Sequence, residues 1–356
     1  MKNARGPAVV LSNHTSSFDQ FIACHASRRR MTYVLSDALY YTRSYSWVFS
    51  SLHLVHKQQF FTSISDIKYM KEVIKNNGIL LIFPTGVIST CGKGTEPFSA
   101  TGKFLKMLQA DTYVIREHGM YLTNPKWQEG IRTGKPETEI FRLFSAEELK
   151  SQTAEDIQKK ITEALNFNDY EWQESKMVEY KNGSDIHGLE NVLHSCPECN
   201  SHFSIENIDN TLTCTKCGFT TRADNYGFLT GSHFKYPSSW ESALHNSLKT
   251  SIRQDPGFSY SSKVSITRLD KKQRKFVKME DGTATVTMER IKVKLVSGAE
   301  IYNESTSSFP TLPMVPGSYF ELQDGKSIFR CFPEEKKDAA YITDIVMCIS
   351  EIKKGM

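Results

Sequence analysis

Two short cysteine pairs constrain this chain more than any other feature of its sequence. Cys196 and Cys199 form the first CxxC pair, Cys214 and Cys217 form the second, and residues 200–213 separate them. Each pair places two thiolates at one corner, and two pairs together complete a tetrahedral zinc site. Because four protein ligands leave the metal no open position, we expect a structural zinc ion that folds a stretch too small for its own core.

Other uses of these thiols are less consistent with the sequence. The remaining cysteines are scattered, at positions Cys24, Cys91, Cys331 and Cys348. A disulfide framework normally comes with dense cysteines in a short secreted chain, so reduced thiols are favoured. A redox CxxC is disfavoured because neither pair follows a strand in a thioredoxin-like βαβ pattern. With four thiolates present, we expect His194 and His202 beside the site rather than as ligands.

The first part of the chain alternates strand-like and helix-like segments up to about residue 165. This alternation predicts an α/β fold with a mostly parallel sheet flanked by helices. Short apolar runs predict buried strands at residues 7–12, 31–36, 78–83 and 112–119. Apolar residues at helical spacing predict helices at residues 66–78 and 99–110, and a charged amphipathic pair at 145–166.

The remainder of the chain has a different pattern. After the cysteine pairs, a segment with Gly, Pro, Ser and aromatic residues is expected to be a partly helical connection. Alternating apolar and polar residues then predict a β-rich domain closed by a helix. The predicted order is an α/β domain over 1–170, a zinc ribbon over 190–222, a linker over 223–258 and a β-rich domain with a C-terminal helix over 259–356.

Charge and hydropathy place weak limits on location and partners. The formal net charge of +4 fits an anionic partner such as a phosphate or a phospholipid headgroup without identifying one. The chain starts without the apolar core of a signal peptide, and its longest apolar runs fall far short of the ~20 residues that span a bilayer. We therefore expect a cytoplasmic protein whose membrane contact, through surfaces such as residues 27–31 and 40–41, is peripheral and at the inner membrane surface.

A histidine and an aspartate follow the first predicted strand, in the stretch LSNHTSSFDQF. One interpretation is structural: Ser16 caps a helix, Asp19 completes the capping box and His14 is a plain loop residue. The other is chemical: Asp19 holds the His14 imidazole in one tautomer while its other nitrogen takes a proton from a substrate hydroxyl. The two roles of Asp19 do not exclude each other, and the spacing alone is weak support for the second.

These residues resemble the NHxxxxD block of the glycerolipid acyltransferases, the family of 1-acylglycerol-3-phosphate acyltransferases. A second block of that family, commonly FPEGxRS, is similar to FPTGVIS at residues 83–89. Thr85 stands where the family has Glu, Ile88 where it has Arg, and Lys57 where a basic residue, usually Arg, is common. Residues 117–127 resemble a segment of one bacterial branch, which also looks similar in its linker, its two-pair cysteine module and its β-rich tail.

The resemblance implies transfer of a fatty acyl group from acyl-CoA or acyl carrier protein to a hydroxyl of a lysophospholipid or related acceptor. It implies His14 as the general base and Asp19 as its partner, without a metal or redox cofactor in the reaction. Backbone N–H groups near the helix start or the 83–86 turn are expected to receive the oxyanion. The expected substrate-binding residues are Asn13, Lys57, Phe83, Pro84, Thr85 and Gly86, although an Asn in a turn is more often there for turn chemistry.

The departures from the second block leave the acceptor open. Ile88 cannot bind a phosphate as an arginine fork does, and Thr85 replaces a carboxylate only weakly. Lys57 offers a point charge, with Lys93 and Lys103 as helpers unless they are ordinary surface lysines. Either the acceptor differs from lysophosphatidic acid, or the domain has weakened turnover and keeps a lipid-binding or scaffold role; the retained His14 and Asp19 favour the first.

A zinc-ribbon protein that binds nucleic acid is a third class of function. The residues between the cysteine pairs, at 201–213, are not basic and lack a stripe of Lys and Arg interleaved with aromatic residues. Nucleic acid is therefore not an expected partner, whereas acyl thioester and lysolipid substrates are.

Overall fold

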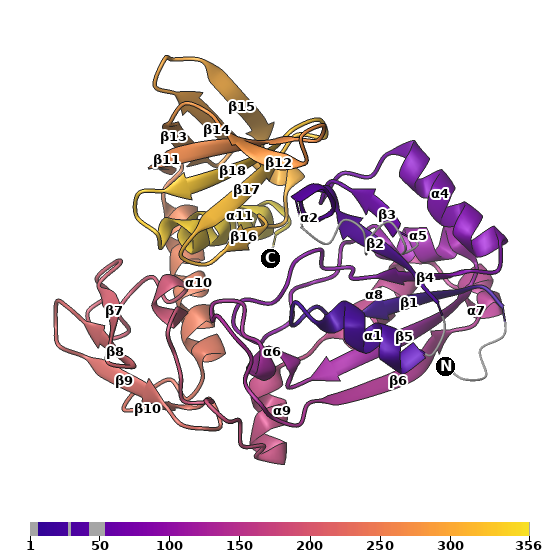
Figure 1. The fold of residues 1–356 in the computed structure, drawn as a ribbon, viewed down its shortest axis with the longest axis horizontal. Helices are drawn as coiled ribbons and strands as arrows, with labels where there is room; N and C mark the ends of the chain where they lie inside the picture. Colours follow the sequence, from indigo (N-terminus) through magenta and orange to yellow (C-terminus); the bar gives the residue numbers. More distant parts are fainter. Residues whose placement is uncertain (1–5, 28–29, 43–53, 356) are drawn as a thin grey trace. The chain divides into compact units, whose positions relative to one another are not determined.

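The computed structural model describes residues 6–27, 30–42 and 54–355 (Figure 1). The chain divides into two compact units. The first holds residues 1–125 and 131–178, and the second holds residues 126–130 and 179–356.

The first unit is built on a six-stranded sheet with the strand order β3-β2-β4-β1-β5-β6. The first five strands of this order pair in parallel, and β6 pairs antiparallel to β5. The strands are β1 (Ala8–Ser12), β2 (Thr32–Ser36), β3 (Leu54–Lys57), β4 (Ile79–Ile82), β5 (Asp111–His118) and β6 (Glu137–Phe144). The predicted α/β class with a mostly parallel sheet is confirmed.

Helices cover both faces of this sheet, which explains why its central strands are continuous apolar runs. On β1, Val9 and Leu11 pack on one side with residues of α4, α5, α7 and α8, whereas Ala8 and Val10 pack on the other side with Ala23 of α1. The helices are α1 (Asp19–Ser27), α2 (Asp37–Thr42), α4 (Ile64–Lys75), α5 (Thr101–Leu108), α6 (Met120–Thr123), α7 (Ala146–Ser151), α8 (Ala154–Leu165) and α9 (Asp169–Lys176).

The four predicted strands of the first unit are present as β1, β2, β4 and β5, and the predicted helices as α4, α5, α7 and α8. The structure adds two strands that the sequence analysis did not predict, the four-residue β3 and the longer β6. β6 is an antiparallel edge strand whose residues are mostly exposed or half-buried, so charged side chains interrupt its apolar pattern.

The second unit begins with a small antiparallel sheet that carries the cysteine pairs. Its order is β10-β9-β8-β7, formed by β7 (Ile205–Ile208), β8 (Thr211–Cys214), β9 (Thr220–Ala223) and β10 (Leu229–Thr230). A 3-10 helix, η1 (Leu189–Asn191), precedes it, and α10 (Pro237–Gln254) follows it. The predicted connection over 223–258 is thus occupied largely by α10, whose Trp240 is fully buried.

The rest of the second unit is an antiparallel sheet of eight strands closed by a helix. Seven strands follow the order β15-β14-β13-β11-β18-β17-β16, and β12 pairs with β11. The strands are β11 (Ser259–Asp270), β12 (Lys275–Lys278), β13 (Gly282–Thr287), β14 (Arg290–Leu295), β15 (Glu300–Ser305), β16 (Met314–Val315), β17 (Tyr319–Gln323) and β18 (Ile328–Pro333), with η2 (Thr306–Ser308) between β15 and β16. Helix α11 (Asp338–Lys353) contacts α10 and this sheet, so the predicted β-rich region with a terminal helix is confirmed.

Across the described ranges, no helix combines the length and the apolar character that crossing a bilayer requires. Of the surfaces expected to meet a membrane, Arg28 and Arg29 lie outside the described residues. Tyr40 stacks on His56, with ring centroids 4.1 Å apart, and His56 in turn lies 2.7 Å from Asp37. Membrane contact through this region stays a prediction.

Candidate active site

His14 lies in the loop that joins β1 to α1, at the carboxyl end of a central parallel strand. This edge of a parallel sheet is where ligands of open α/β folds commonly bind. The carbonyl oxygen of His14 accepts a hydrogen bond from the Ser89 N–H at 2.9 Å, which ties the loop to the segment that follows β4. The imidazole is therefore held on a loop that is anchored to the segment after β4.

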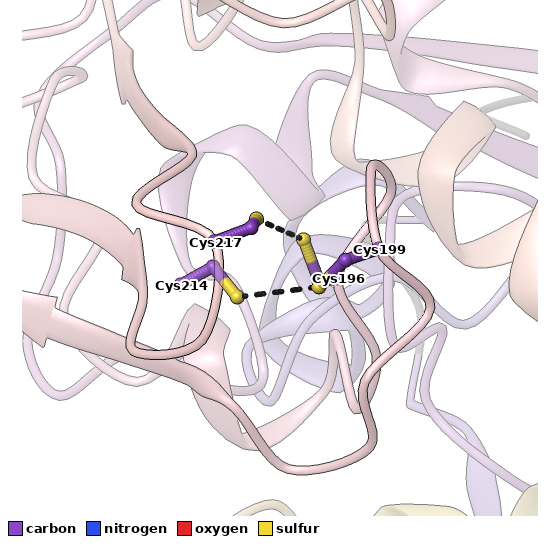
Figure 2. Close-up of side chains that lie close together, drawn as sticks. All are labelled: Cys196, Cys199, Cys214 and Cys217. Atoms are coloured by element: carbon purple, nitrogen blue, oxygen red, sulfur yellow. Dashed lines mark hydrogen bonds between the residues drawn. The ribbon is translucent and has the colours of Figure 1, made fainter.

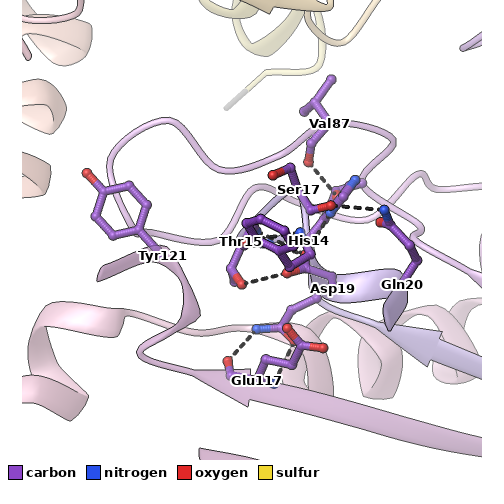
Figure 3. A network of polar contacts seen from close by, with 12 residues as sticks. His14, Thr15, Ser17, Asp19, Gln20, Val87, Glu117 and Tyr121 are labelled. Atoms are coloured by element: carbon purple, nitrogen blue, oxygen red, sulfur yellow. Dashed lines mark hydrogen bonds and ion pairs between the residues drawn. The ribbon is translucent and has the colours of Figure 1, made fainter. Parts of the chain in front are cut away.

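Asp19 is the first residue of α1 and is completely buried. Its carboxylate accepts from His14 Nδ1 at 2.7 Å, and from the backbone N–H groups of Thr15 at 2.6 Å and Ser16 at 3.1 Å (Figure 3). The bond from the Ser16 N–H is the return half of a capping box, and Ser16 Oγ accepts from the Phe18 N–H at 3.1 Å. Asp19 thus caps the helix and orients the imidazole at the same time, and the helix N-terminus favours its negative charge.

The His14 ring is held on one side and accessible at the other. Its Nδ1 faces Asp19, which leaves Nε2 without a partner among the residues the structure describes. The ring stacks on Phe83, with centroids 4.4 Å apart and planes 26° apart, and the side chain remains 17% exposed. If Nδ1 carries the proton donated to Asp19, then Nε2 carries the lone pair that a general base needs.

The Asn13 side chain links the loop after β1 to β5. Its side-chain amide donates to the Glu117 carbonyl oxygen at 2.8 Å and accepts from the Glu117 N–H at 2.8 Å, so the start of the His14 loop is fixed to the end of β5. The residue is buried. These two bonds join segments 104 residues apart, so they are a structural role different from the turn chemistry that the sequence favoured for Asn13, and a contact with substrate stays a prediction.

The FPTG segment forms a tight turn directly after β4. The Gly86 N–H donates to the Phe83 carbonyl oxygen at 3.1 Å, and Gly86 has a φ of 71°, a conformation that favours glycine. A Cβ at Gly86 would also meet the Phe98 ring at 2.9 Å. Thr85 is buried and its Oγ1 donates to the Val87 carbonyl oxygen at 3.1 Å, so this hydroxyl serves the turn itself.

Lys57 ends β3, on the same edge of the parallel sheet as the His14 loop. Its Nζ donates to the Gln58 carbonyl oxygen at 3.1 Å. Burial lowers the pKa of Lys57, opposed by the nearby Asp66 and Asp37 carboxylates. Lys93 and Lys103 are both exposed, which is the ordinary surface state that the sequence analysis held open for them.

Two buried acids that the sequence analysis did not select lie beside Asp19. Glu117 is completely buried, and within the described ranges no donor group reaches either of its carboxyl oxygens, whereas as a protonated acid it can donate to the neighbouring Asp19 carboxylate (Figure 3). Burial raises the pKa of Glu117 to about 11, with the Asp19 and Asp169 carboxylates acting in the same direction. Burial likewise raises the pKa of Asp169 to about 7, although its backbone bonds from Gly119 and Tyr121 oppose this shift. Because its own pKa is raised well above 7, the Glu117 carboxyl group is protonated and neutral at pH 7.

The neutral state of Glu117 predicts a specific pH dependence of stability. Between the ordinary pKa of an unfolded Glu and the raised folded pKa, the folded state binds one proton more than the unfolded state, so stability falls as pH rises. The Glu117 contribution amounts to up to about 1.4 kcal/mol per pH unit. Replacing Glu117 by Gln is expected to flatten this decline between pH 5 and pH 9 in denaturant unfolding. Glu163→Gln, at an exposed carboxylate of α8, should leave the slope unchanged. Parallel curves for wild type and Glu117→Gln would contradict the assignment.

Asn124 is a third site residue that sequence reasoning missed. Its Oδ1 accepts from Ser17 Oγ at 2.8 Å and from Ser16 Oγ at 3.3 Å, so it holds the turn between His14 and Asp19. Both Asn124 and Glu117 fall in the 117–127 segment. The resemblance of residues 117–127 to a segment of one bacterial branch was the only sequence signal for these two residues, and it implied no role for either of them.

The comparison with family models matches residues 1–115 to a family described as Acyltransferase. This part of the chain belongs to the acyltransferase family. The matched acyltransferase region contains His14, Asp19 and the FPTG turn, and it ends within β5 just before Glu117. The second unit lies outside it.

Solved structures give two further likenesses to parts of the chain. The 1-acyl-sn-glycerophosphate acyltransferase PlsC of Thermotoga maritima has 17% sequence identity and a TM-score of 0.40, over 48% of this chain and 67% of that one. The Ran binding domain of Nup2 from Ashbya gossypii has 15% identity and a TM-score of 0.24, over 27% of this chain and 97% of that one. At these TM-scores neither likeness by itself establishes a shared fold. The comparison with curated proteins found no match.

Outside the acyltransferase region, the four paired cysteines come together as predicted. Their sulfur atoms all lie within 4.8 Å of one another, with Cys196 and Cys217 at 3.7 Å and Cys199 and Cys214 at 3.7 Å (Figure 2). Bonds of about 2.3 Å from a zinc ion to four thiolates imply sulfur separations of about 3.8 Å, so the cluster fits a tetrahedral zinc ion. The Glu198 and Lys216 N–H groups each point at a sulfur, of Cys196 and Cys214, at 3.4 Å.

Proposed function

We propose that this chain is an acyltransferase that moves a fatty acyl group from acyl-CoA or acyl carrier protein to a hydroxyl of a lysophospholipid or related acceptor. The observation that carries this proposal is the His14 imidazole, which is held by buried Asp19 at Nδ1 and is open at Nε2. The acyltransferase family of residues 1–115 gives the reaction class.

The reaction divides into two proton transfers at His14 Nε2. In the first step Nε2 removes the proton of the acceptor hydroxyl as its oxygen attacks the thioester carbonyl carbon, and Asp19 stabilises the imidazolium that forms. In the second step the carbon–sulfur bond breaks and the imidazolium returns the proton to the departing thiolate. The products are an ester and a free thiol, and the base is restored.

The tetrahedral intermediate needs hydrogen-bond donors for its oxyanion. The N–H groups of Thr15 and Ser16 donate to Asp19, and that of Gly86 donates to Phe83, so the expected donors at the helix start and in the FPTG turn are already engaged. The backbone N–H groups of Val87 and Ile88 have no acceptor among the described residues. We assign the oxyanion contact to this segment, which follows the Phe83 ring that stacks on His14.

The remaining substrate contacts belong to the same edge of the sheet. Phe83 and Pro84 give an apolar surface beside His14, while Thr85 and Gly86 shape the turn that supports it. Lys57 supplies the positive charge for an anionic acceptor or for the phosphate groups of the donor. The Cys196, Cys199, Cys214 and Cys217 cluster would hold a structural zinc ion outside this reaction.

Direct acyl transfer tests the proposal. The full chain is incubated with acyl-CoA or acyl carrier protein and with acceptors that do and do not carry phosphate, and the ester product is measured by mass spectrometry. Transfer to at least one acceptor that requires His14 supports an enzyme. Lipid binding without transfer to any acceptor would instead support a scaffold. A scaffold is the second candidate because Thr85 and Ile88 stand where the family commonly has Glu and Arg. Salt-sensitive binding of RNA or DNA would favour a nucleic-acid-binding function.

Replacing Ile88 by arginine is expected to change the preference for the acceptor. An arginine at this half-buried position could bind a phosphate in two places, and one charge-assisted hydrogen bond contributes about 1.5 to 3 kcal/mol. Ile88→Arg is therefore expected to lower KM for 1-acylglycerol 3-phosphate about tenfold to hundredfold, without lowering KM for an uncharged monoacylglycerol. Val87→Arg adds the same charge one residue away and serves as the control. Equal effects of the two variants would show that only the net charge matters.

A further inference from the structure

A second group of metal-ligating side chains lies in the second unit, between helices α10 and α11. His245 comes from α10, and Asp344 and Cys348 come from α11. One ligand atom from each residue lies within 4.8 Å of the others. Asp344 and Cys348 are four residues apart on their helix, so both side chains project from the same face. The group thus combines nitrogen, oxygen and sulfur donors at one helix–helix contact.

The His245 ring is oriented at both of its nitrogen atoms. Its Nε2 lies 3.0 Å from a Glu351 carboxylate oxygen, and that same oxygen accepts from Lys249 Nζ at 2.6 Å. Its Nδ1 contacts the Asp344 carboxylate and lies 3.5 Å from Cys348 Sγ. Metal-ligating histidines commonly donate one ring N–H to a carboxylate and bind the metal through the other nitrogen. His245 has this arrangement, with Nε2 at Glu351 and with Nδ1 facing Asp344 and Cys348.

His194 approaches the same carboxylate from the segment before the first cysteine pair. Its Nδ1 lies 3.0 Å from Ser195 Oγ, and this hydroxyl lies 3.1 Å from His202 Nδ1. Its Nε2 has no hydrogen bond in the described part of the chain and lies 3.5 Å from Asp344 Oδ2, although the side chain is only 6% exposed. If the Ser195 hydroxyl accepts from Nδ1, a lone pair on Nε2 faces a carboxylate oxygen, and a cation between them removes the repulsion.

Hydrogen bonding alone explains only part of this cluster. The bonds of His245 to Asp344 and Glu351 would hold α10 against α11 without any metal. The Cys348 thiol, which is fully buried, can donate to the His245 carbonyl oxygen at 3.6 Å, but its sulfur also lies 3.5 Å from His245 Nδ1, where a thiolate and an imidazole can share one cation. The bonds of His245 also leave the buried Nε2 of His194 with only a long contact to Asp344 Oδ2 at 3.5 Å, which is weak compensation for a polar group in a core.

We propose that His245, Asp344 and Cys348 bind a divalent metal ion of the zinc class, and that the His194 ring, which lies outside this three-residue group but 3.5 Å from Asp344 Oδ2, turns in as the fourth ligand. Two imidazoles, one thiolate and one carboxylate form a donor set that suits zinc. Four protein ligands make the site structural, so the ion joins α10, α11 and the segment that leads into the Cys196 pair. The second unit then holds two metal ions, one in the four-cysteine cluster and one in this mixed site.

The metal content of the purified full-length chain tests the proposal. After dialysis against metal-free buffer, the wild-type protein is expected to retain two zinc equivalents per chain. Cys348→Ser and His245→Gln should each retain one, and the Cys196→Ser/Cys199→Ser double variant should retain the other. Cys331→Ser, at a fully buried thiol on β18, should keep both. One equivalent in the wild type, unchanged by Cys348→Ser, would overturn the second site.

Cobalt substitution gives a readout that does not depend on the stability of a variant. Thiolate-to-cobalt absorption grows with the number of thiolate ligands, so the four-cysteine cluster and the one-cysteine site differ in intensity. Titration of the zinc-free wild-type chain with cobalt should give two phases, of which one has roughly a quarter of the thiolate absorption of the other. A single phase that saturates at one equivalent would show that the His245, Asp344 and Cys348 contacts are hydrogen bonds only.

Discussion

Replacing His14 by alanine is expected to lower kcat for acyl transfer by about 10²- to 10⁴-fold, the range over which general acid–base catalysis contributes. The loss should fall on kcat more than on KM, since Nε2 acts on the reacting hydroxyl and thiolate and not on the remote parts of either substrate. Steady-state kinetics with the best acceptor found for the wild type measures both constants. His25→Ala, at an exposed histidine of α1, is the matched control.

The neighbouring aspartate gives this prediction a second test. Asp19→Asn keeps the size of the side chain and one oxygen that can accept from His14 Nδ1 and from the Thr15 and Ser16 N–H groups, all of which reach Oδ2. That oxygen is neutral, so it stabilises the imidazolium and the start of α1 less than a carboxylate does. A reduced kcat is expected together with a lower unfolding temperature, because the cap of α1 is weakened. Full transfer activity in both His14→Ala and Asp19→Asn would reject the proposed base and its partner.

Removing a ligand from the four-cysteine cluster is expected to unfold the segment around it. Binding of a structural zinc ion supplies about 10 to 16 kcal/mol in small zinc domains, far more than the short strands of this segment could contribute by packing. In Cys196→Ser, we therefore expect proteases to cut between residues 190 and 223, and the far-ultraviolet circular dichroism of the whole chain to lose the contribution of the strands in this segment. The acyltransferase region should keep its own unfolding transition.

Two comparisons separate metal loss from a general effect of the substitution. Cys24→Ser changes an exposed thiol of the first unit and should leave the protease pattern as in the wild type. Treatment of the wild type with a strong chelator should reproduce the cleavage seen in Cys196→Ser, and added zinc should reverse it only in the wild type. Resistance of the chelated protein to protease would mean that the segment folds without metal.

The pattern of residues predicted much of the first unit because both faces of its sheet are covered. Continuous apolar runs such as residues 79–82 indicate strands buried on both faces when helical segments alternate with them along the chain. The edge strand β6 was missed for the opposite reason, since its exposed face carries charged residues. The cysteine cluster was predictable from spacing alone, because two CxxC pairs at this separation are typical of a structural zinc site.

Local sequence also placed His14 and Asp19 together, since both belong to one loop and one helix start. It could not place Glu117, Asn124 or Asn13, whose contacts join segments about a hundred residues apart. The same limit applies to His245 and Asp344, which meet only because α10 and α11 pack against each other. The sequence by itself determined the elements and the short-range pair, whereas tertiary packing decided which buried acids and imidazoles face each other, because hydrogen bonds and desolvation depend on distances in space and not on separation along the chain.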